Sequence, residues 1–329
     1  MVVFPDLGTG LPAPARNYVL PVADPSLDRP TLSPHGLALV AANRALVTQI
    51  GYFKLALIDT ANATFMEEFT LPDPALNVHY DGDGTLAVNP AHTFVLAVTD
   101  LDSLWVIPAP FDHTAAVTML ALPSSSATFQ TRAIAFDQTS GRAYIALQDG
   151  IAVLDPPYTS IAFTIASANG ATGAHGPVVG AIALSADGTT LAATRGLNSS
   201  NFANDVRIFH APFSATSVPE TLTIAGAAPD GLTFTPSGDK LVAVESLGPP
   251  RVYAIAAPYS ATSVVETLAI TTTGDQSGFE DVDISADGQL AALSGQSGGL
   301  DDALVVLKAP FTAAAFTSYD LPLPRLAFP

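Results

Sequence analysis

An internal repeat of about fifty residues is the feature of this sequence that most constrains its fold. Apolar segments that can start a repeat begin near residues 36, 84, 132, 180, 231 and 281, so successive copies lie 48 to 51 residues apart. One more step of 48 from residue 281 reaches residue 329, so the array accounts for most of the sequence. A period of this length indicates one supersecondary unit stacked on copies of itself. We therefore expect a single domain over residues 1–329, with an N-terminal segment, 1–35, before the first repeat.

The copy that starts at Gly231 shows how one repeat is built. Apolar and polar residues alternate at its start, and the turn residues Pro-Ser-Gly-Asp follow at 236–239. Alternation with a period of two, interrupted by such turns, is typical of short β-strands. The predicted strands cover residues 232–235, 241–244, 251–255 and 266–270. Each repeat is therefore predicted to be a four-stranded antiparallel meander.

Two short signatures mark the turns of the repeat. Ser-Ala-Asp-Gly occurs at 185–188 and 285–288, between apolar runs, where glycine accepts the positive φ that a hairpin turn requires. An Ala-Pro-aromatic triplet follows the third strand of four copies, beginning at Ala109, Ala211, Ala257 and Ala309. Proline ends the strand because it lacks the N–H that a ladder needs. We expect the aromatic residue after it to pack between neighbouring sheets.

Four-stranded sheets repeated around an axis form a β-propeller, which leaves only short strand edges open. A β-solenoid is the alternative, but its coils are shorter than about fifty residues. The predicted fold is therefore all-β, a six-bladed β-propeller of four-stranded antiparallel blades. Residues 17–22 have the register of a fourth strand that lacks its first three, so we expect this N-terminal strand to close the ring. The sequence leaves open whether it replaces or supplements the corresponding strand at 318–322.

Composition narrows the classes of partner. Lysine and arginine number 12 against 30 acidic residues, a net charge of −18, so nucleic acid and anionic membranes are poor partners, and cations, sugars or basic proteins suit this surface better. The absence of cysteine excludes disulfides and thiolate chemistry. No apolar run is long enough for a membrane span, and the first residues show no signal peptide. The scarcity of lysine slightly favours a secreted or periplasmic protein whose leader precedes this sequence.

The Ser-Ala-Asp-Gly turns and the period resemble the YVTN and lactonase-like β-propellers over most of the chain. That resemblance implies that two sets of loops share one face at the central channel: those leading into each first strand, and those joining second to third strands. A small molecule or glycan needs polar and charged side chains that converge on such a face. The candidate ligand-binding residues in these loops are Tyr52, Asp100, Arg132, Arg195 and Asn198. Solvated loops of an acidic protein carry the same residue types, so the alternative is a surface without a site.

A calcium site is one interpretation of the acidic residues on that face. Glu280, Asp281 and Glu245, with Asp230, would offer the carboxylate oxygens that Ca²⁺ prefers. No contiguous calcium-binding loop is present, so this hypothesis depends on the residues meeting in space.

A metal-assisted hydrolase or lactonase is the alternative function. Pro229-Asp230-Gly231 resembles the entry turn of gluconolactonase-type propellers, in which the aspartate binds metal and acts as the base. That resemblance implies Asp230 as the base, with His175 or Glu280 assisting. The sequence departs from the family at the third and fourth entries, where Arg132 and Gly180 stand in place of the ligand asparagines.

His175 is the histidine selected as a candidate catalytic residue, because it lies in a glycine-rich entry loop. His92, His113 and His210 fall at turns or strand ends on the side away from the channel mouth, and no nucleophile elbow or phosphate loop occurs. The favoured function is thus the binding of a small molecule, a glycan or a cation at the channel. The sequence also leaves open a protein partner. A scaffold without chemistry is the third interpretation.

Overall fold

The computed structural model describes six sheets and part of their connections. The described residues are 2–3, 16–17, 34–49, 54–61, 64–70, 86–98, 103–123, 133–147, 150–166, 179–195, 205–225, 227, 229–245, 251–270, 276–297, 303–311 and 316–320. Every regular element among these residues is a β-strand. In the same residues there is no helix with the length and apolarity needed to cross a membrane.

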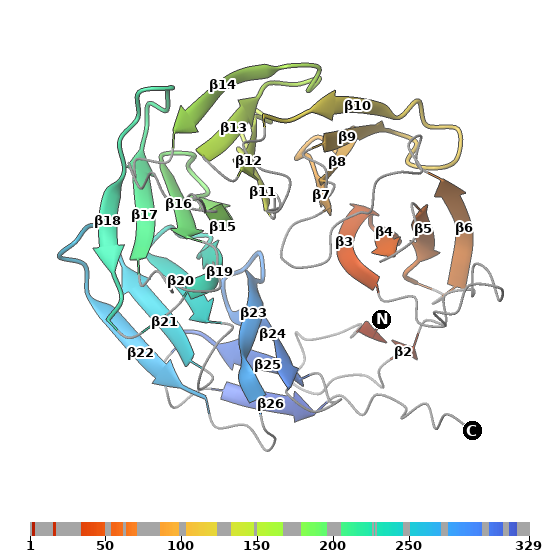
Figure 1. Cartoon of the computed structure of the whole chain (residues 1–329). Helices are drawn as coiled ribbons and strands as arrows, with labels where there is room; N and C mark the ends of the chain where they lie inside the picture. Colours follow the sequence, from red (N-terminus) through yellow and green to blue (C-terminus); the bar gives the residue numbers. More distant parts are fainter. Residues whose placement is uncertain are drawn as a thin grey trace.

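Six four-stranded antiparallel sheets stand around a central axis like the blades of a propeller (Figure 1). Strands consecutive in the sequence are neighbours in each sheet, so every blade is the predicted meander. The first strand of each blade lies innermost and the fourth lies at the perimeter (Figure 1). The predicted all-β, six-bladed propeller is confirmed.

Blades 1 to 6 follow the order of the chain. The innermost strands are β3 (Pro34–Ala41), β7 (Leu86–Val88), β11 (Ile134–Phe136), β15 (Val179–Leu184), β19 (Pro229–Phe234) and β23 (Gln276–Ile284). The second strands are β4 (Arg44–Gln49), β8 (Phe94–Val98), β12 (Ala143–Leu147), β16 (Thr190–Arg195), β20 (Lys240–Glu245) and β24 (Leu290–Ser297). The third strands are β5 (Lys54–Asp59), β9 (Ser103–Pro108), β13 (Gly150–Leu154), β17 (Asp205–His210), β21 (Arg251–Ala256) and β25 (Ala303–Lys308). The outermost strands are β6 (Thr64–Thr70), β10 (Thr118–Ala121), β14 (Ile161–Ala166), β18 (Glu220–Thr223), β22 (Val265–Ala269) and β26 (Phe316–Asp320).

The hydrophobic core lies between the blades. All residues of β12 and β13 are buried, whereas β22 exposes or half-exposes every residue except Leu268. A second or third strand faces a neighbouring blade on each side, so both of its faces must be apolar. Along β12, Tyr144 packs in the cluster shared with blade 4 and Ile145 in the cluster shared with blade 2. Five such clusters join blades 1 to 6 in sequence.

The Ala-Pro-aromatic triplets have the packing role that the sequence predicts. Tyr259 is 4% exposed, and Tyr158, in the variant triplet Pro-Pro-Tyr that blade 3 has at the same place, is 1% exposed. Their hydroxyls donate hydrogen bonds to the carbonyl oxygens of Gly141 and Gly238, both at 2.6 Å. The ring of Tyr158 also meets Phe94 of the preceding blade edge-on, with 5.5 Å between centroids. These aromatic residues therefore fill the space between sheets at one end of the blades.

The two ends of each blade are different. We call the end at which the first strand begins the entry end, and the opposite end, which carries the turn from first to second strand, the turn end. The connection from third to fourth strand also lies at the turn end. In blade 2 the amide of Ala109, in that connection, donates a hydrogen bond to the carbonyl oxygen of Thr93, in the first turn, at 2.9 Å.

The predicted N-terminal closing strand is not confirmed. Asn17 belongs to β2 (Arg16–Asn17), which pairs with β1 (Val2–Val3) in a separate two-stranded sheet. The remainder of the predicted strand, residues 18–22, lies outside the described residues. Blade 6 takes its fourth strand, β26, from its own repeat, so the N-terminal segment does not replace it.

Candidate functional site

A β-bulge interrupts the pairing of the first and second strands at the entry end of blades 1, 4, 5 and 6. In blade 5, Pro229 pairs with Glu245 and Gly231 with the next residue, Val244, so Asp230 is an extra residue on β19. Glu280 is the extra residue at the corresponding point of β23 in blade 6, and β15 has a similar shift after Val179. Bulges bend a strand and re-aim a side chain, and they are frequent beside functional sites. The bulge positions Asp230 and Glu280 are thus acidic residues that the sequence selected.

The innermost strands of blades 5 and 6 begin earlier than the sequence indicated. The Pro-Asp-Gly triplet, interpreted as an entry turn before the strand, lies within β19 itself. The innermost strand of blade 6 starts at Gln276 and not near Asp281. The turn-forming residues do not end these strands because each bulge absorbs an extra residue without breaking the ladder.

Five of the predicted site residues occupy strand positions at the entry end of three adjacent blades. Arg195 and Glu245 are the last residues of β16 and β20, while Asp230, Glu280 and Asp281 lie near the beginning of β19 and β23. Antiparallel pairing places the end of a second strand beside the beginning of the first strand. Strand β19 lies against both β15 and β23, so the three blades are direct neighbours.

Glu245 is a buried charged residue at the entry end. Its side chain is 2% exposed, and its Oε2 accepts a hydrogen bond of 2.7 Å from the hydroxyl of Tyr253 on β21. The Nη1 atom of Arg251, at the start of β21, lies 3.7 Å from Oε1. Both partners face the same way as Glu245 because they lie on the side of blade 5 that packs against blade 4. A buried carboxylate therefore holds one tyrosine and one arginine at the entry end.

The pKa values of Tyr253 and Arg251 are both raised, for different reasons. Removal from water raises the pKa of Tyr253 to about 12, and the hydrogen bond to Glu245 adds to that effect. The pKa of Arg251 is also raised, first by its hydrogen bond with Tyr253 and then by the charge of Glu245. At neutral pH the tyrosine is thus a neutral donor, and the arginine remains a cation.

The other five predicted site residues are not among those that the structure describes. Tyr52, Asp100, Arg132, His175 and Asn198 lie outside the described residues, so their roles remain predictions.

Asp281 is half-buried on β23, and the amide of Val282 donates a hydrogen bond of 2.7 Å to its Oδ1. The Asp281 carboxylate thus takes part in local backbone bonding at the entry end.

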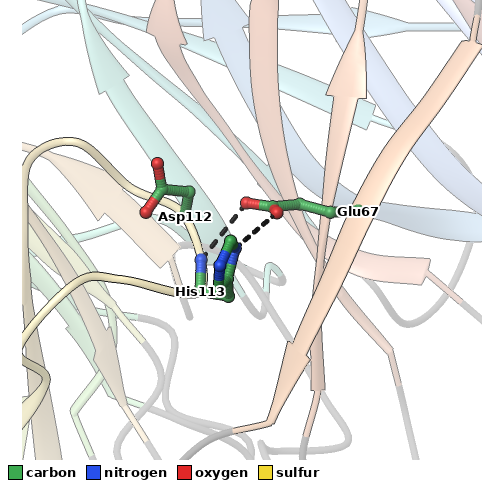
Figure 2. A group of neighbouring side chains, drawn as sticks. All are labelled: Glu67, Asp112 and His113. Atoms are coloured by element: carbon green, nitrogen blue, oxygen red, sulfur yellow. Dashed lines mark hydrogen bonds and ion pairs between the residues drawn. The ribbon is translucent and has the colours of Figure 1, made fainter.

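A second group of ionisable side chains lies at the turn end, where sequence reasoning placed no site. Glu67 on β6 of blade 1 faces Asp112 and His113 in the β9–β10 connection of blade 2 (Figure 2). One potential ligand atom from each residue lies within 4.8 Å of the others. The ring Nδ1 of His113 donates to Glu67 Oε2 at 2.8 Å, and the backbone amide of His113 donates to Oε1 at 3.2 Å. The available signal was a break in the repeat, since Asp-His stands where two other copies have Ser-Ala.

Comparisons with known proteins inform the fold and no more. No protein-family model and no curated protein matches this sequence. Among solved structures, the chain is similar to Kuenenia stuttgartiensis hydrazine synthase, with a TM-score of 0.63 and 15% identity, over 84% of this chain and 76% of that one. At this identity the likeness concerns the fold alone. The chain is therefore identified by its architecture, as a six-bladed β-propeller.

Proposed function

We propose that the protein binds a small molecule, a glycan or a cation at the entry end of blades 4, 5 and 6, beside the central channel. One observation carries this proposal: acidic residues occupy the bulge positions of two neighbouring innermost strands, Asp230 on β19 and Glu280 on β23. A bulge interrupts the ladder, so its residue is free of the strict alternation that sends side chains into a neighbouring blade.

Calcium is the proposed cation. Ca²⁺ is bound by six to eight oxygens, many of them from carboxylates, and Asp281 and Glu280 are consecutive on one strand. Glu245 would then support the site without binding the ion directly, because its two oxygens already face Tyr253 and Arg251. Arg251 would serve an anionic group of a small ligand or glycan at the same place.

The test uses the full chain, melted with and without millimolar CaCl₂ after treatment with a chelator. A ligand that binds only the folded state raises the melting temperature with concentration. We expect a rise that Glu280→Gln abolishes and that the control Glu266→Gln, on the exposed face of β22, leaves intact. Absence of any rise removes the calcium site. Binding on a glycan array that is lost in Glu280→Gln would support the glycan instead, and a flat array together with no calcium effect contradicts the proposal.

A metal-assisted hydrolase or lactonase is the second candidate. It is favoured by Asp230, the bulge residue within the Pro-Asp-Gly triplet that resembles the gluconolactonase-type propellers. Asp230 would act as base, with His175 assisting from its glycine-rich segment. We expect hydrolysis on a panel of lactones to be lost in Asp230→Asn, with the melting temperature unchanged. A panel without turnover by the native protein argues against an enzyme.

A further inference from the structure

The turn that follows the third strand has the same sequence pattern in blades 4 and 5, and blade 2 departs from that pattern at two positions. Blades 4 and 5 read Phe-Ser-Ala-Thr from Phe213 and Tyr-Ser-Ala-Thr from Tyr259, while blade 2 reads Phe-Asp-His-Thr from Phe111. The aromatic residue that opens each turn packs in the cluster shared with the preceding blade. Asp112 and His113 are therefore substitutions within an otherwise preserved structural unit.

The turn itself requires neither side chain. In blade 5 the hydroxyl of Ser260 accepts a hydrogen bond from the amide of Thr262 at 3.3 Å and lies 3.0 Å from the Thr262 hydroxyl. In blade 2 a single oxygen of Asp112, Oδ1, accepts the equivalent bonds from the amide and hydroxyl of Thr114, at 2.8 and 2.5 Å. Serine thus satisfies the turn, and the second oxygen of Asp112 is additional to what the turn needs.

An acidic residue of the preceding blade faces this turn. Glu67 on β6 pairs with Leu57, and Leu57 shares a cluster with Phe111. By register, Glu220 occupies the same position before blade 5, where the turn carries Ser260 and Ala261. A glutamate at this position is thus compatible with a neutral turn. Blade 2 instead adds a second carboxylate and an imidazole beside Glu67, at a cost in charge repulsion that folding does not require.

We propose that Glu67, Asp112 and His113 form a binding site for a divalent transition-metal ion, with Zn²⁺ as the ion that best fits the donors. Imidazole nitrogen with carboxylate oxygen is a common zinc donor set, and two carboxylates neutralise the charge of the ion. The site lies at the turn end, away from the entry end, and joins blade 1 to blade 2.

The geometry needs only small movements to accept the ion. His113 Nδ1 and Glu67 Oε2 are 2.8 Å apart, while two ligands of a tetrahedral zinc lie about 3.3 Å apart for bonds near 2.0 Å. When the ion binds to Nδ1 of His113, it takes the place of the proton on that nitrogen. The neutral ring then carries its proton on Nε2. The side chain of His113 is 67% exposed and that of Glu67 is 27% exposed, so the ion can reach them from solvent.

The test measures Zn²⁺ binding to the chelator-treated full chain by isothermal titration calorimetry. The informative variant combines Asp112→Ser with His113→Ala, because it installs the turn sequence that blades 4 and 5 already use and so preserves the fold. We expect the native chain to bind one ion that this variant binds at least about tenfold more weakly, since even a residue outside the first coordination shell typically contributes that much. Glu67→Gln should also weaken Zn²⁺ binding. The melting temperature of this variant in the absence of metal should equal that of the native chain.

His210→Ala is the matched control, since His210 is also exposed and lies at the end of β17 in blade 4. It should leave the binding event intact. The proposal is overturned if the native chain shows no such event with Zn²⁺ at millimolar concentration, or if the double variant or Glu67→Gln binds as tightly as the native chain.

Discussion

Glu245 shows how one buried charge sets the properties of the residues around it. Its carboxylate is enclosed between blades 4 and 5 and is stabilised by the hydroxyl of Tyr253 and the guanidinium of Arg251. Removing one partner of a buried charge costs more than the pair itself contributes, because the remaining charge keeps its desolvation penalty. The sequence predicted that Glu245 lies at the face around the channel, which is the entry end. It did not predict that the partners of Glu245 would come from the next strand, β21.

Tyr253→Phe is expected to change the alkaline stability of the protein. The pKa of Tyr253 is about 12 in the folded protein against an ordinary value of 10.0. Its raised pKa contributes stability that is complete below pH 10 and disappears as the pH rises toward 12, roughly 2 to 3 kcal/mol in all. Unfolding free energies from urea titrations at pH 8 to 12 should therefore fall less steeply for Tyr253→Phe than for the native chain. Equal slopes contradict the assignment.

At pH 7 the same substitution acts in another way. It removes the hydrogen bond that the Tyr253 hydroxyl donates to the buried Glu245 carboxylate, so we expect the Tyr253→Phe protein to be less stable by about 1 to 3 kcal/mol. Phenylalanine keeps the apolar packing of the ring, so this loss reports the hydrogen bond.

At the scale of the element, the turn from first to second strand recurs with one hydrogen-bond scheme. The amides of Gly188, Gly238 and Gly288 each donate to the carbonyl oxygen three residues earlier, at 2.8, 2.8 and 2.7 Å. Each glycine has a positive φ, between 68° and 71°. This conformation costs an L-residue roughly 1 to 2 kcal/mol, which explains why the Asp-Gly and Ser-Gly pairs predicted these turns reliably.

Gly238→Ala measures that conformational cost in isolation. A Cβ at Gly238 would meet no atom within 4 Å, so the expected loss of about 1 kcal/mol comes from φ alone. Gly238→Asn should lose less, because asparagine tolerates positive φ better. Urea denaturation gives both values, and an alanine variant as stable as the native chain would show that the turn relaxes.

At the scale of the whole molecule, stability depends on contacts between consecutive blades. Each middle strand is apolar on both faces because it serves two interfaces, as Tyr144 and Ile145 do in blade 3. The edge-on contact of Tyr144 with Phe213, 5.6 Å between ring centroids, joins blade 3 to blade 4. A blade without its neighbour therefore exposes a large apolar face.

A fragment of residues 1–178, which ends before β15, is expected to lose cooperative unfolding. It keeps blades 1 to 3 but exposes the face of blade 3 that packs on Leu191 and Phe209 of blade 4. Differential scanning calorimetry should show a broad transition at a lower temperature than that of the full chain. A fragment that melts as sharply, and at the same temperature, is incompatible with a closed ring.

Much of this structure could be predicted from the sequence because its signals are local. Period, strand alternation and turn chemistry act within one repeat, and six copies of them gave the blade and the number of blades. The bulges at Asp230 and Glu280 could not be predicted in this way, since an extra residue shows only when the partner strand is known. The group of Glu67, Asp112 and His113 was missed for a related reason: Glu67 is 46 residues from His113 in the sequence and meets it only across a blade junction.

The sequence by itself determined the repeating β-meander, because each turn and strand preference is satisfied within a few residues of the chain. Only the tertiary structure decided which charges share an environment. Blades pack side by side in a ring, so the partner of a side chain depends on the register of two sheets that no local pattern encodes.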